Sequence, residues 1–336
     1  MIQYENIRNV HFEISSLCNA SCPWCPRTFW GYPHNGGYPE VNFTLDQAKK
    51  VFTTDFLTQL TSIYINGNFG DIVMNPEGPA IVDYFVRTNP DLIITVSTNG
   101  SARDKIFWTD LASTGATVQF CIDGLEDTHH LYRQNTVWST VIRNAQTFIK
   151  AGGQAVWKMI QFDYNQHQIE SCRQMSKQLG FIDFCLVDDG RNTAPVFNHA
   201  GQLTHVLGNY VGEKNFTVLF HKKTTDQILL EDIIQDRTPA KSISCQAKNN
   251  NSIYISSTGD VSPCCWTGFY PKTYGAGQYH QAANAQLVPL IVKNNALEYP
   301  LKDCVNWFKS VEDTWKIDRY EQGRLVICDD VCGEKQ

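Results

Sequence analysis

The sequence Leu17-Cys18-Asn19-Ala20-Ser21-Cys22-Pro23-Trp24-Cys25 places three cysteines within nine residues. It directly follows Val10–Ser15, where alternating apolar and polar residues predict a strand. A loop with this spacing can wrap one metal centre with three thiolates. A structural zinc site takes four ligands, and no fourth cysteine lies nearby. An iron–sulfur cluster held by three cysteines leaves one iron open to another ligand. The loop therefore indicates chemistry more than scaffolding, with zinc or incidental cysteines as the alternative.

Short apolar runs alternate with longer amphipathic ones from residue 9 to about residue 190. The predicted strands are Val10–Ser15, Ser62–Asn66, Leu92–Ser97, Thr117–Ile122, Ala155–Phe162 and Phe181–Val187. The predicted helices are Leu45–Leu60, Pro79–Arg87, Ala102–Ser113, Ser139–Ala151 and His167–Leu179. Thr44 and Gln47 predict a capping box at the start of the first helix. The alternation implies parallel units, so the predicted fold is α/β, a partial (β/α)6 TIM-like barrel. In such barrels the chemistry lies on loops after the carboxyl ends of the strands.

The composition is that of a globular protein. Of the 336 residues, 42% are hydrophobic and 18% are charged, which excludes a disordered, collagen-like or coiled-coil chain. The net charge is −6, and no run of Lys or Arg exceeds two residues. Nucleic-acid binding is therefore not expected.

The amino-terminal residues do not resemble a targeting segment. Glu5 and Arg8 lie where a signal peptide would have its apolar core, and no apolar stretch approaches the roughly 20 residues of a membrane helix. We therefore expect a cytoplasmic protein without membrane contact. In a reducing compartment, metal binding is the leading explanation for the 12 cysteines.

The alternation fades after residue 189, and one further unit is predicted at Phe216–Phe220 and Asp226–Ile234. From about residue 241 the chain carries short strand signals such as Ile253–Ser256, together with turn residues and half of the cysteines. We place a boundary near residue 236. The sequence thus predicts a barrel domain over residues 1–235 and a small α+β domain over residues 236–336.

The carboxyl-terminal third contains Cys245, Cys264, Cys265, Cys304, Cys328 and Cys332. A predicted tight turn at Gly259 brings Cys245 and Cys264 onto the two legs of a hairpin. Cys328 and Cys332 can close the site from one turn of the chain. A Zn(Cys)4 ribbon and a [4Fe–4S] cluster fit these four cysteines equally well.

The first cysteine loop, with Trp24 before its last cysteine, resembles the hallmark of the radical S-adenosylmethionine (SAM) superfamily. The resemblance extends over about the first 190 residues. It implies that Cys18, Cys22 and Cys25 hold a [4Fe–4S] cluster whose open iron takes the amino and carboxylate groups of SAM, with Trp24 beside the cofactor. It also implies a flavodoxin- or ferredoxin-type electron donor, whose electron cleaves SAM to a 5′-deoxyadenosyl radical.

Further segments resemble the SAM-binding segments of the family. Gly67-Asn68-Phe69-Gly70-Asp71 lies where many relatives carry Gly-Gly-Glu-Pro to bind the SAM ammonium. Gly70 would let the backbone approach closely, and Asp71 would accept hydrogen bonds, with a solvated turn residue as the alternative. Ser97 and Asn99 belong to a segment that reaches the SAM ribose or carboxylate.

The later strand ends carry the remaining candidates. Asp123-Gly124 followed by His129, His130 and Arg133 resembles the family's strand-end Asp-Gly with a following His and Arg. Arg133 would hold the SAM carboxylate, and either histidine could instead be exposed. Gln161 and Asn165 lie where relatives contact SAM, although Asn165 could also cap the following helix.

The Cys-x13-Gly-x4-Cys run with late paired cysteines resembles the auxiliary-cluster extension called SPASM, or its shorter twitch form. The longer form uses seven or more cysteines for two clusters, and six are present here. The resemblance therefore implies one auxiliary [4Fe–4S] cluster held by Cys245, Cys264, Cys328 and Cys332. Cys265 and Cys304 remain to replace a ligand, to donate hydrogen to a substrate radical, or to pack as small apolar residues.

The expected function is that of a radical SAM oxidoreductase that abstracts hydrogen from a substrate carbon. The auxiliary cluster would assist oxidation or bond formation on a small polar molecule or a peptide. The first alternative is a redox-neutral epimerase, an isomerase in which a cysteine returns a hydrogen atom. The alternative from another class is a non-catalytic zinc-binding interaction module.

Overall fold

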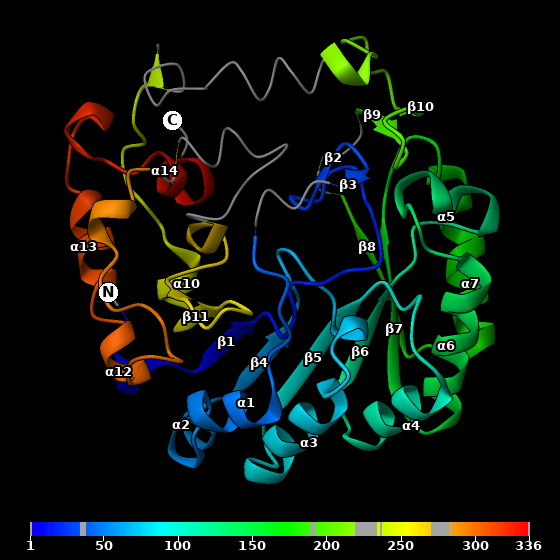
Figure 1. Ribbon diagram of the computed structural model, residues 1–336, viewed down its shortest axis with the longest axis horizontal. Helices are drawn as coiled ribbons and strands as arrows, with labels where there is room; N and C mark the ends of the chain where they lie inside the picture. Colours follow the sequence, from blue (N-terminus) through cyan, green and yellow to red (C-terminus); the bar gives the residue numbers. More distant parts are fainter. Residues whose placement is uncertain are drawn as a thin grey trace.

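The computed structural model describes residues 2–33, 38–188, 190, 193–218, 234–235, 237–269, 283 and 285–334. Its main sheet has eight strands in the order β12-β11-β1-β4-β5-β6-β7-β8 (Figure 1). The barrel strands are β1 (Asn9–Phe12), β4 (Ser62–Ile65), β5 (Ile93–Thr98), β6 (Thr117–Cys121), β7 (Gln154–Ile160) and β8 (Asp183–Val187). Neighbouring barrel strands all pair in parallel. The predicted α/β fold is confirmed, and the barrel is partial because β12 and β8 stand at the two ends of the sheet.

Helices cover the outer side of the barrel strands (Figure 1). They are α1 (Leu45–Val51), α2 (Thr54–Gln59), α3 (Gly78–Thr88), α4 (Lys105–Ser113), α5 (Glu126–Tyr132), α6 (Trp138–Lys150) and α7 (Ile169–Leu179). Short 3-10 turns are η1 (Tyr4–Asn6), η2 (Ile72–Met74) and η3 (Gln166–Gln168). The predicted capping box of Thr44 and Gln47 is confirmed. Helix α5 was not predicted, because its seven residues carry little periodic signal.

The predicted single helix over Leu45–Leu60 is wrong. The chain leaves the helical conformation at Phe52, whose side chain is fully buried in the core. The hydroxyl of Thr53 then accepts a hydrogen bond from Phe56 N at 3.3 Å and caps a new helix. Burial of Phe52 and the second cap together outweigh continued helix periodicity.

The apolar core lies between the sheet and the helices and not inside the barrel. Along β4, the outward-facing Ile63 and Ile65 are buried, whereas Ser62 and Tyr64 are only half-buried. β6 repeats the pattern over its first four residues. Because side chains alternate between the two faces of a strand, this pattern separates a buried outer face from a polar inner one.

The carboxyl-terminal segment joins the barrel sheet. β11 (Ser252–Ile255) pairs in parallel with β1 and antiparallel with β12 (Val261–Ser262), so the strand predicted at Ile253–Ser256 is confirmed within one residue. The other elements of the segment are α10 (Gln246–Asn249), η4 (Thr267–Phe269), η5 (Val288–Leu290), α12 (Leu301–Cys304), α13 (Phe308–Thr314), η6 (Tyr320–Gln322) and α14 (Val326–Cys332). The domain boundary near residue 236 stays a prediction, and the sheet continues across it.

Two small hairpins lie outside the main sheet. One is formed by β2 (Thr28–Phe29) and β3 (Tyr32–Pro33), the other by β9 (Ala194–Phe197) and β10 (Leu203–Leu207). The β9–β10 hairpin was not predicted. Of the additional unit predicted at Phe216–Phe220 and Asp226–Ile234, residues 216–218 are helical instead of extended, and nearly all the rest lies outside the described residues. Within the described ranges, no helix is long and apolar enough to cross a membrane.

Glu13, just after β1, is a fully buried carboxylate that joins three segments. Its Oε1 accepts hydrogen bonds from the main-chain nitrogens of Phe69 at 2.6 Å and Gly70 at 3.0 Å. Its Oε2 accepts one from the hydroxyl of Tyr254 on β11 at 2.6 Å. Burial raises the pKa of Glu13, against the opposing effect of these hydrogen bonds.

We predict that Glu13→Gln makes the protein more stable relative to wild type as the pH rises above about 4.5, the ordinary pKa of the side chain. Between this value and the raised pKa of the folded state, the folded wild-type protein binds more protons than the unfolded chain, so its stability falls with pH by up to about 1.4 kcal/mol per unit. Unfolding midpoints of the anaerobically prepared protein between pH 5 and pH 8 measure the difference. The exposed Glu298→Gln is the control. A difference between Glu13→Gln and wild type that does not grow with pH would contradict the assignment.

Candidate functional site

The first cysteine loop follows β1 and lies under the β9–β10 hairpin. Cys22 is buried, and Cys18 and Cys25 are half-buried. They pack with residues of both small hairpins, among them Phe29 and Phe197. The hydrogen bond from Cys25 N to Cys22 O, at 3.0 Å, turns the loop back on itself. The predicted position of the three cysteines, in the loop after the first strand, agrees with the structure.

Hydrogen-bond donors point at two of these sulfurs. Asn99 Nδ2 lies 3.6 Å from Cys18 Sγ, and Arg133 Nη1 lies 3.8 Å from Cys22 Sγ. Burial raises the pKa of the Cys18 thiol, and Asp71, Cys25 and Cys22 raise it further. Burial also raises the pKa of Cys22 to about 11, although Arg133 opposes the shift. A metal centre binds cysteines as thiolates, so this crowded set of thiols with outer donors fits an iron–sulfur cluster.

Arg133 is anchored by a buried carboxylate. Its Nε donates to Asp123 Oδ2 at 2.6 Å, and Asp123 Oδ1 accepts from Ile160 N at 2.7 Å. The guanidinium is thereby fixed between Asp123 and Cys22. The role of Arg133 in holding the SAM carboxylate stays a prediction. No separate role was predicted for Asp123, which proves to be the residue that orients Arg133.

His129 and His130 lie in different surroundings. His129 is fully buried, its Nδ1 accepts from Asp123 N at 3.1 Å, and its Nε2 is 3.0 Å from Thr136 Oγ1. Burial, reinforced by Arg133, lowers the pKa of His129 to about 3. The side chain is therefore neutral and supports the strand end. His130 is exposed.

Asp71 ties the loop after β4 to the loop after β5. Oδ1 accepts from Val73 N at 3.1 Å and from Thr98 Oγ1 at 2.6 Å, and Oδ2 accepts from Asn99 N at 2.7 Å. Asp71 is buried, so the alternative of a solvated turn residue is wrong. Burial raises the pKa of its carboxyl against the effect of these bonds. A contact between Asp71 and the SAM ammonium stays a prediction.

Gly70 is required by a close approach of two protein segments. A Cβ at this position would lie 1.8 Å from the carbonyl oxygen of Ser15. A Cβ at Gly67 would likewise lie 2.2 Å from Gly70 O and 2.8 Å from Glu13 Oε1. The two glycines therefore let the Gly67–Asp71 segment lie against the end of β1. Contact between Gly70 and SAM stays a prediction.

The remaining predicted SAM contacts lie along the strand ends. Ser97 is buried, with its hydroxyl 3.3 Å from Cys121 Sγ. Trp24 is 40% exposed and packs edge-on against Trp30 at 4.7 Å. Gln161 is half-buried, and its side chain makes no hydrogen bond within the described part of the chain. All these contacts with SAM stay predictions.

Asn165 is fully buried and makes its hydrogen bonds inside the protein. Its Nδ2 donates to Ile160 O at 3.0 Å and to Asp123 O at 3.4 Å, and its Oδ1 accepts from Phe162 N at 2.7 Å. It does not cap the following turn through its side chain, so that alternative is wrong. A contact between Asn165 and SAM stays a prediction.

The four predicted auxiliary ligands line one apolar pocket. Its cysteines are Cys245, Cys264, Cys328 and Cys332, and its apolar wall includes Trp315. Cys328 and Cys332 lie four residues apart on α14, which places them on one helix face. The Cys245 and Cys332 thiols share a hydrogen bond, which raises the pKa of Cys245 and lowers that of Cys332.

The two leftover cysteines lie in different environments, and neither lines this pocket. Cys304 is fully buried in the main core, and its thiol lies 3.8 Å from Tyr299 O. The interpretation of Cys304 as a packed apolar residue is thus confirmed. Cys265 is half-buried and is close enough to Glu13 and Tyr254 for electrostatic interaction. It therefore lies between the auxiliary pocket and the barrel.

Over the described ranges, no group of three or more His, Cys, Asp or Glu side chains is gathered so that it could hold a metal ion. A [4Fe–4S] cluster binds each cysteine to a different iron, so its ligands lie farther apart than those of one ion. The first three cysteines share one loop and the four carboxyl-terminal ones share one pocket, arrangements that fit iron–sulfur clusters.

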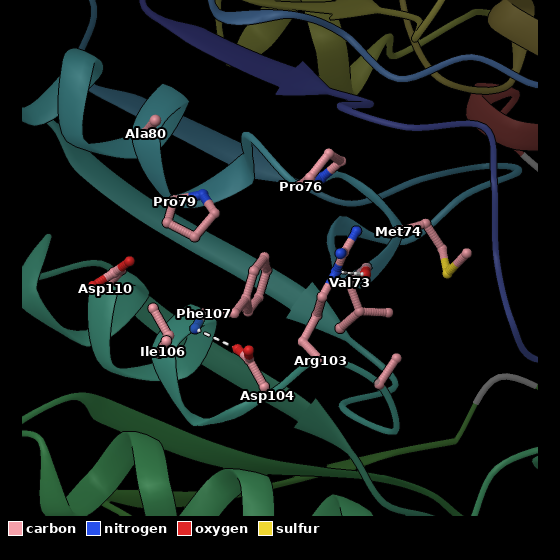
Figure 2. A pocket seen from close by; sticks show the side chains of 11 residues that line it. Val73, Met74, Pro76, Pro79, Ala80, Arg103, Asp104, Ile106, Phe107 and Asp110 are labelled. Atoms are coloured by element: carbon pink, nitrogen blue, oxygen red, sulfur yellow. Dashed lines mark hydrogen bonds between the residues drawn. The ribbon is translucent and has the colours of Figure 1, made fainter.

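A hollow of about 610 Å³ lies on the helix side of the sheet, between α3 and α4 (Figure 2). Its wall includes Pro79 on α3, Phe107 on α4 and Arg103 in the preceding loop. No predicted site residue lines it. This hollow is therefore separate from both cysteine groups.

Comparisons with known proteins give structural neighbours only. No family model and no curated protein matches the chain. The crystal structure of Streptococcus suis SuiB bound to S-adenosylmethionine is similar with a TM-score of 0.56 and 14% identity, over 95% of this chain and 68% of SuiB. Native anSMEcpe with bound AdoMet is similar with a TM-score of 0.55 and 16% identity, over 96% of this chain and 89% of anSMEcpe. The chain thus shares its fold with SuiB and anSMEcpe, both solved with S-adenosylmethionine (AdoMet) bound, as the sequence resemblance implied for the fold.

Proposed function

We propose that the protein is a radical SAM enzyme with one auxiliary [4Fe–4S] cluster. The observation that carries the proposal is the place of Cys18, Cys22 and Cys25. They lie in one loop at the carboxyl end of β1, within a fold shared with structures that bind SAM. Three cysteines in such a loop leave one iron of a cluster open to a further ligand.

When bound, the cluster and SAM supply the electron and the carbon radical that abstracts hydrogen from the substrate. The chain's own residues orient these groups. Asn99 and Arg133 direct donors at the cysteine sulfurs, and such outer hydrogen bonds tune the potential of a cluster. Asp71 holds the loop that carries Asn99. The β9–β10 hairpin packs on the cysteine loop and covers part of it.

We further infer that Cys245, Cys264, Cys328 and Cys332 hold the auxiliary cluster. The support is their common apolar pocket. An auxiliary cluster beside the substrate can accept an electron from it, so the preferred reaction is oxidation or bond formation. A flavodoxin- or ferredoxin-type partner in the cytosol would reduce the SAM-binding cluster. The solved structures include SuiB bound to its precursor peptide SuiA, and anSMEcpe bound to the Cp18Cys peptide. For this chain we propose a short peptide segment or a small polar molecule.

A redox-neutral epimerase is the second candidate, because Cys265 lies beside the barrel. Its thiol is near Tyr254 and Glu13 and does not line the auxiliary pocket. A thiol in this position can return a hydrogen atom to a substrate radical. The zinc-binding module from another class remains testable by metal analysis.

We predict that Cys18→Ala, Cys22→Ala and Cys25→Ala each abolish 5′-deoxyadenosine formation under dithionite. Two remaining thiolates hold a cluster weakly, whereas the auxiliary pocket is untouched. Each variant should therefore retain about four irons, those of one [4Fe–4S] cluster. Product analysis by chromatography and iron analysis of anaerobic protein provide the measurement. Wild-type SAM cleavage by any of the three would overturn the assignment of the loop.

We predict about eight irons and about eight sulfides per wild-type chain, the content of two [4Fe–4S] clusters. Cys245→Ser and Cys328→Ser should lower the iron content to about four, because each removes one auxiliary ligand. Cys304→Ser is the matched control and should keep all the iron, since Cys304 does not line the pocket. One zinc beside about four irons in the wild-type protein would refute the auxiliary cluster.

The Cys265→Ala variant separates the two candidate reactions. Under the oxidative proposal, turnover in heavy water gives an oxidised product without deuterium at the reacting carbon, and Cys265→Ala keeps this activity. Under the epimerase candidate, the wild-type product carries deuterium, and the variant loses both deuterium uptake and net turnover. Mass spectrometry of the product distinguishes these results, with Cys304→Ala as the control.

A further inference from the structure

The inner face of the partial barrel carries a group of polar side chains. On β4 and over the first four residues of β6 the inward-facing side chains are half-buried and their outward-facing neighbours are buried, and on β7 the inward-facing Lys158 is half-buried between buried neighbours. The half-buried inward set around the middle of the strands comprises His11, Tyr64, Thr95, Gln119, Lys158 and Cys185. Packing alone would favour apolar side chains at these positions. This polar face is therefore a candidate binding surface.

Lys158 carries the only lysine charge on the described barrel strands. It lies on β7, and its Nζ lies 3.4 Å from Tyr64 Oη on β4 and 3.5 Å from Gln119 Oε1 on β6. Two strands separate β7 from β4 in the sheet, so the side chain reaches across the inside of the barrel. The ammonium thus lies within the curve of the barrel and not on the outer surface.

No carboxylate within the described residues lies at ion-pair distance from Lys158 Nζ. Arg133 and Arg27, in contrast, each have a carboxylate partner. Arg133 is paired with Asp123, and Arg27 with Glu40 at 3.2 Å. Burial lowers the pKa of Lys158, but interactions with Cys121 and Tyr64 outweigh it and raise the pKa overall. The side chain is therefore an ammonium at neutral pH, held by two neutral oxygens.

Tyr64 and Gln119 add donors at the same place. The oxygens of both face the ammonium, which leaves the phenolic proton of Tyr64 and the amide protons of Gln119 for another acceptor. Within the described chain neither group donates to a protein acceptor. An ammonium with a hydroxyl and an amide beside it is a set of donors suited to a group with negatively charged oxygens.

We propose that the barrel interior binds an anionic group of the substrate, a carboxylate or a phosphate, at Lys158 with Tyr64 and Gln119. The inference rests on the proposed function, to which it adds the chemical class of the substrate. Lys158 precedes the end of β7 by two residues, and the first cysteine loop lies at the same carboxyl ends of the strands. An anionic group bound at Lys158 lets the rest of the substrate extend toward that loop.

The test uses inorganic phosphate and succinate as probes with the reconstituted protein and SAM. Phosphorus and proton NMR titrations at constant ionic strength measure both affinities. We expect saturable binding of at least one probe to wild type, and a loss of about ten-fold or more in Lys158→Gln, the size of one charge-assisted hydrogen bond. The exposed Lys150→Gln is the control and should bind like wild type. Binding of only one probe identifies the anion as phosphate or carboxylate.

No saturable binding of either probe, or equal affinities of wild type and Lys158→Gln, would overturn the inference. Tyr64→Phe removes one hydroxyl, should weaken binding several-fold, and decides the question if Lys158→Gln does not fold. Iron content and 5′-deoxyadenosine formation are measured on the same samples. If the wild-type protein holds no iron and forms no 5′-deoxyadenosine but binds anions through Lys158, the proposed function fails and the anion site stands. If Lys158→Gln keeps both properties and its anion affinity, the anion site alone fails.

Discussion

The parallel pairing of β1 with β4 on one side and β11 on the other joins the segments that carry the two cysteine groups into one sheet. Asn9 on β1 is in register with Ser62 and with Ser252. Parallel strands end at the same edge of a sheet, so the loop after β1 and the turn after β11 leave the sheet side by side. The loop after β1 carries Cys18, Cys22 and Cys25, whereas the chain after the turn runs back along β11 as the antiparallel β12 before it reaches Cys264. One sheet thus joins the strand before the first cysteine loop to the two strands between Cys245 and Cys264.

Buried carboxylates fix the loops at this edge. Glu13 after β1 accepts from main-chain nitrogens in the segment after β4, and Asp71 in that segment accepts from Asn99 N after β5. Asp123 after β6 accepts from Ile160 N on β7. Each carboxylate therefore satisfies main-chain donors of a neighbouring strand end that would otherwise be buried without partners. Removing them from water is costly, and the raised pKa values of Glu13 and Asp71 express that cost.

Local sequence patterns predicted the barrel strands and both cysteine groups because each of these features is visible within a short stretch of sequence. Period-two and helical periodicities are properties of a few neighbouring residues, and cysteine spacing is read directly. The missed features depend on distant contacts. Nothing near Glu13 indicates that Phe69, Gly70 and Tyr254 will bind it, and the break at Phe52 follows from burial of its ring. The β9–β10 hairpin likewise depends on packing against Phe29 and the cysteine loop.

The cysteine loop brings together groups that disfavour ionised thiols. Cys18 has Cys22, Cys25 and Asp71 within electrostatic reach, and each of these raises its pKa. Arg133 lies beside Cys22, but its charge is already matched by Asp123. Three thiolates would therefore add negative charge to a buried region that has little to offset it. Three thiols would instead leave the donors of Asn99 and Arg133 facing sulfurs that are weak acceptors. A cationic centre bound to the sulfurs resolves both problems, so its binding would contribute to the stability of this edge of the fold as well as to its chemistry.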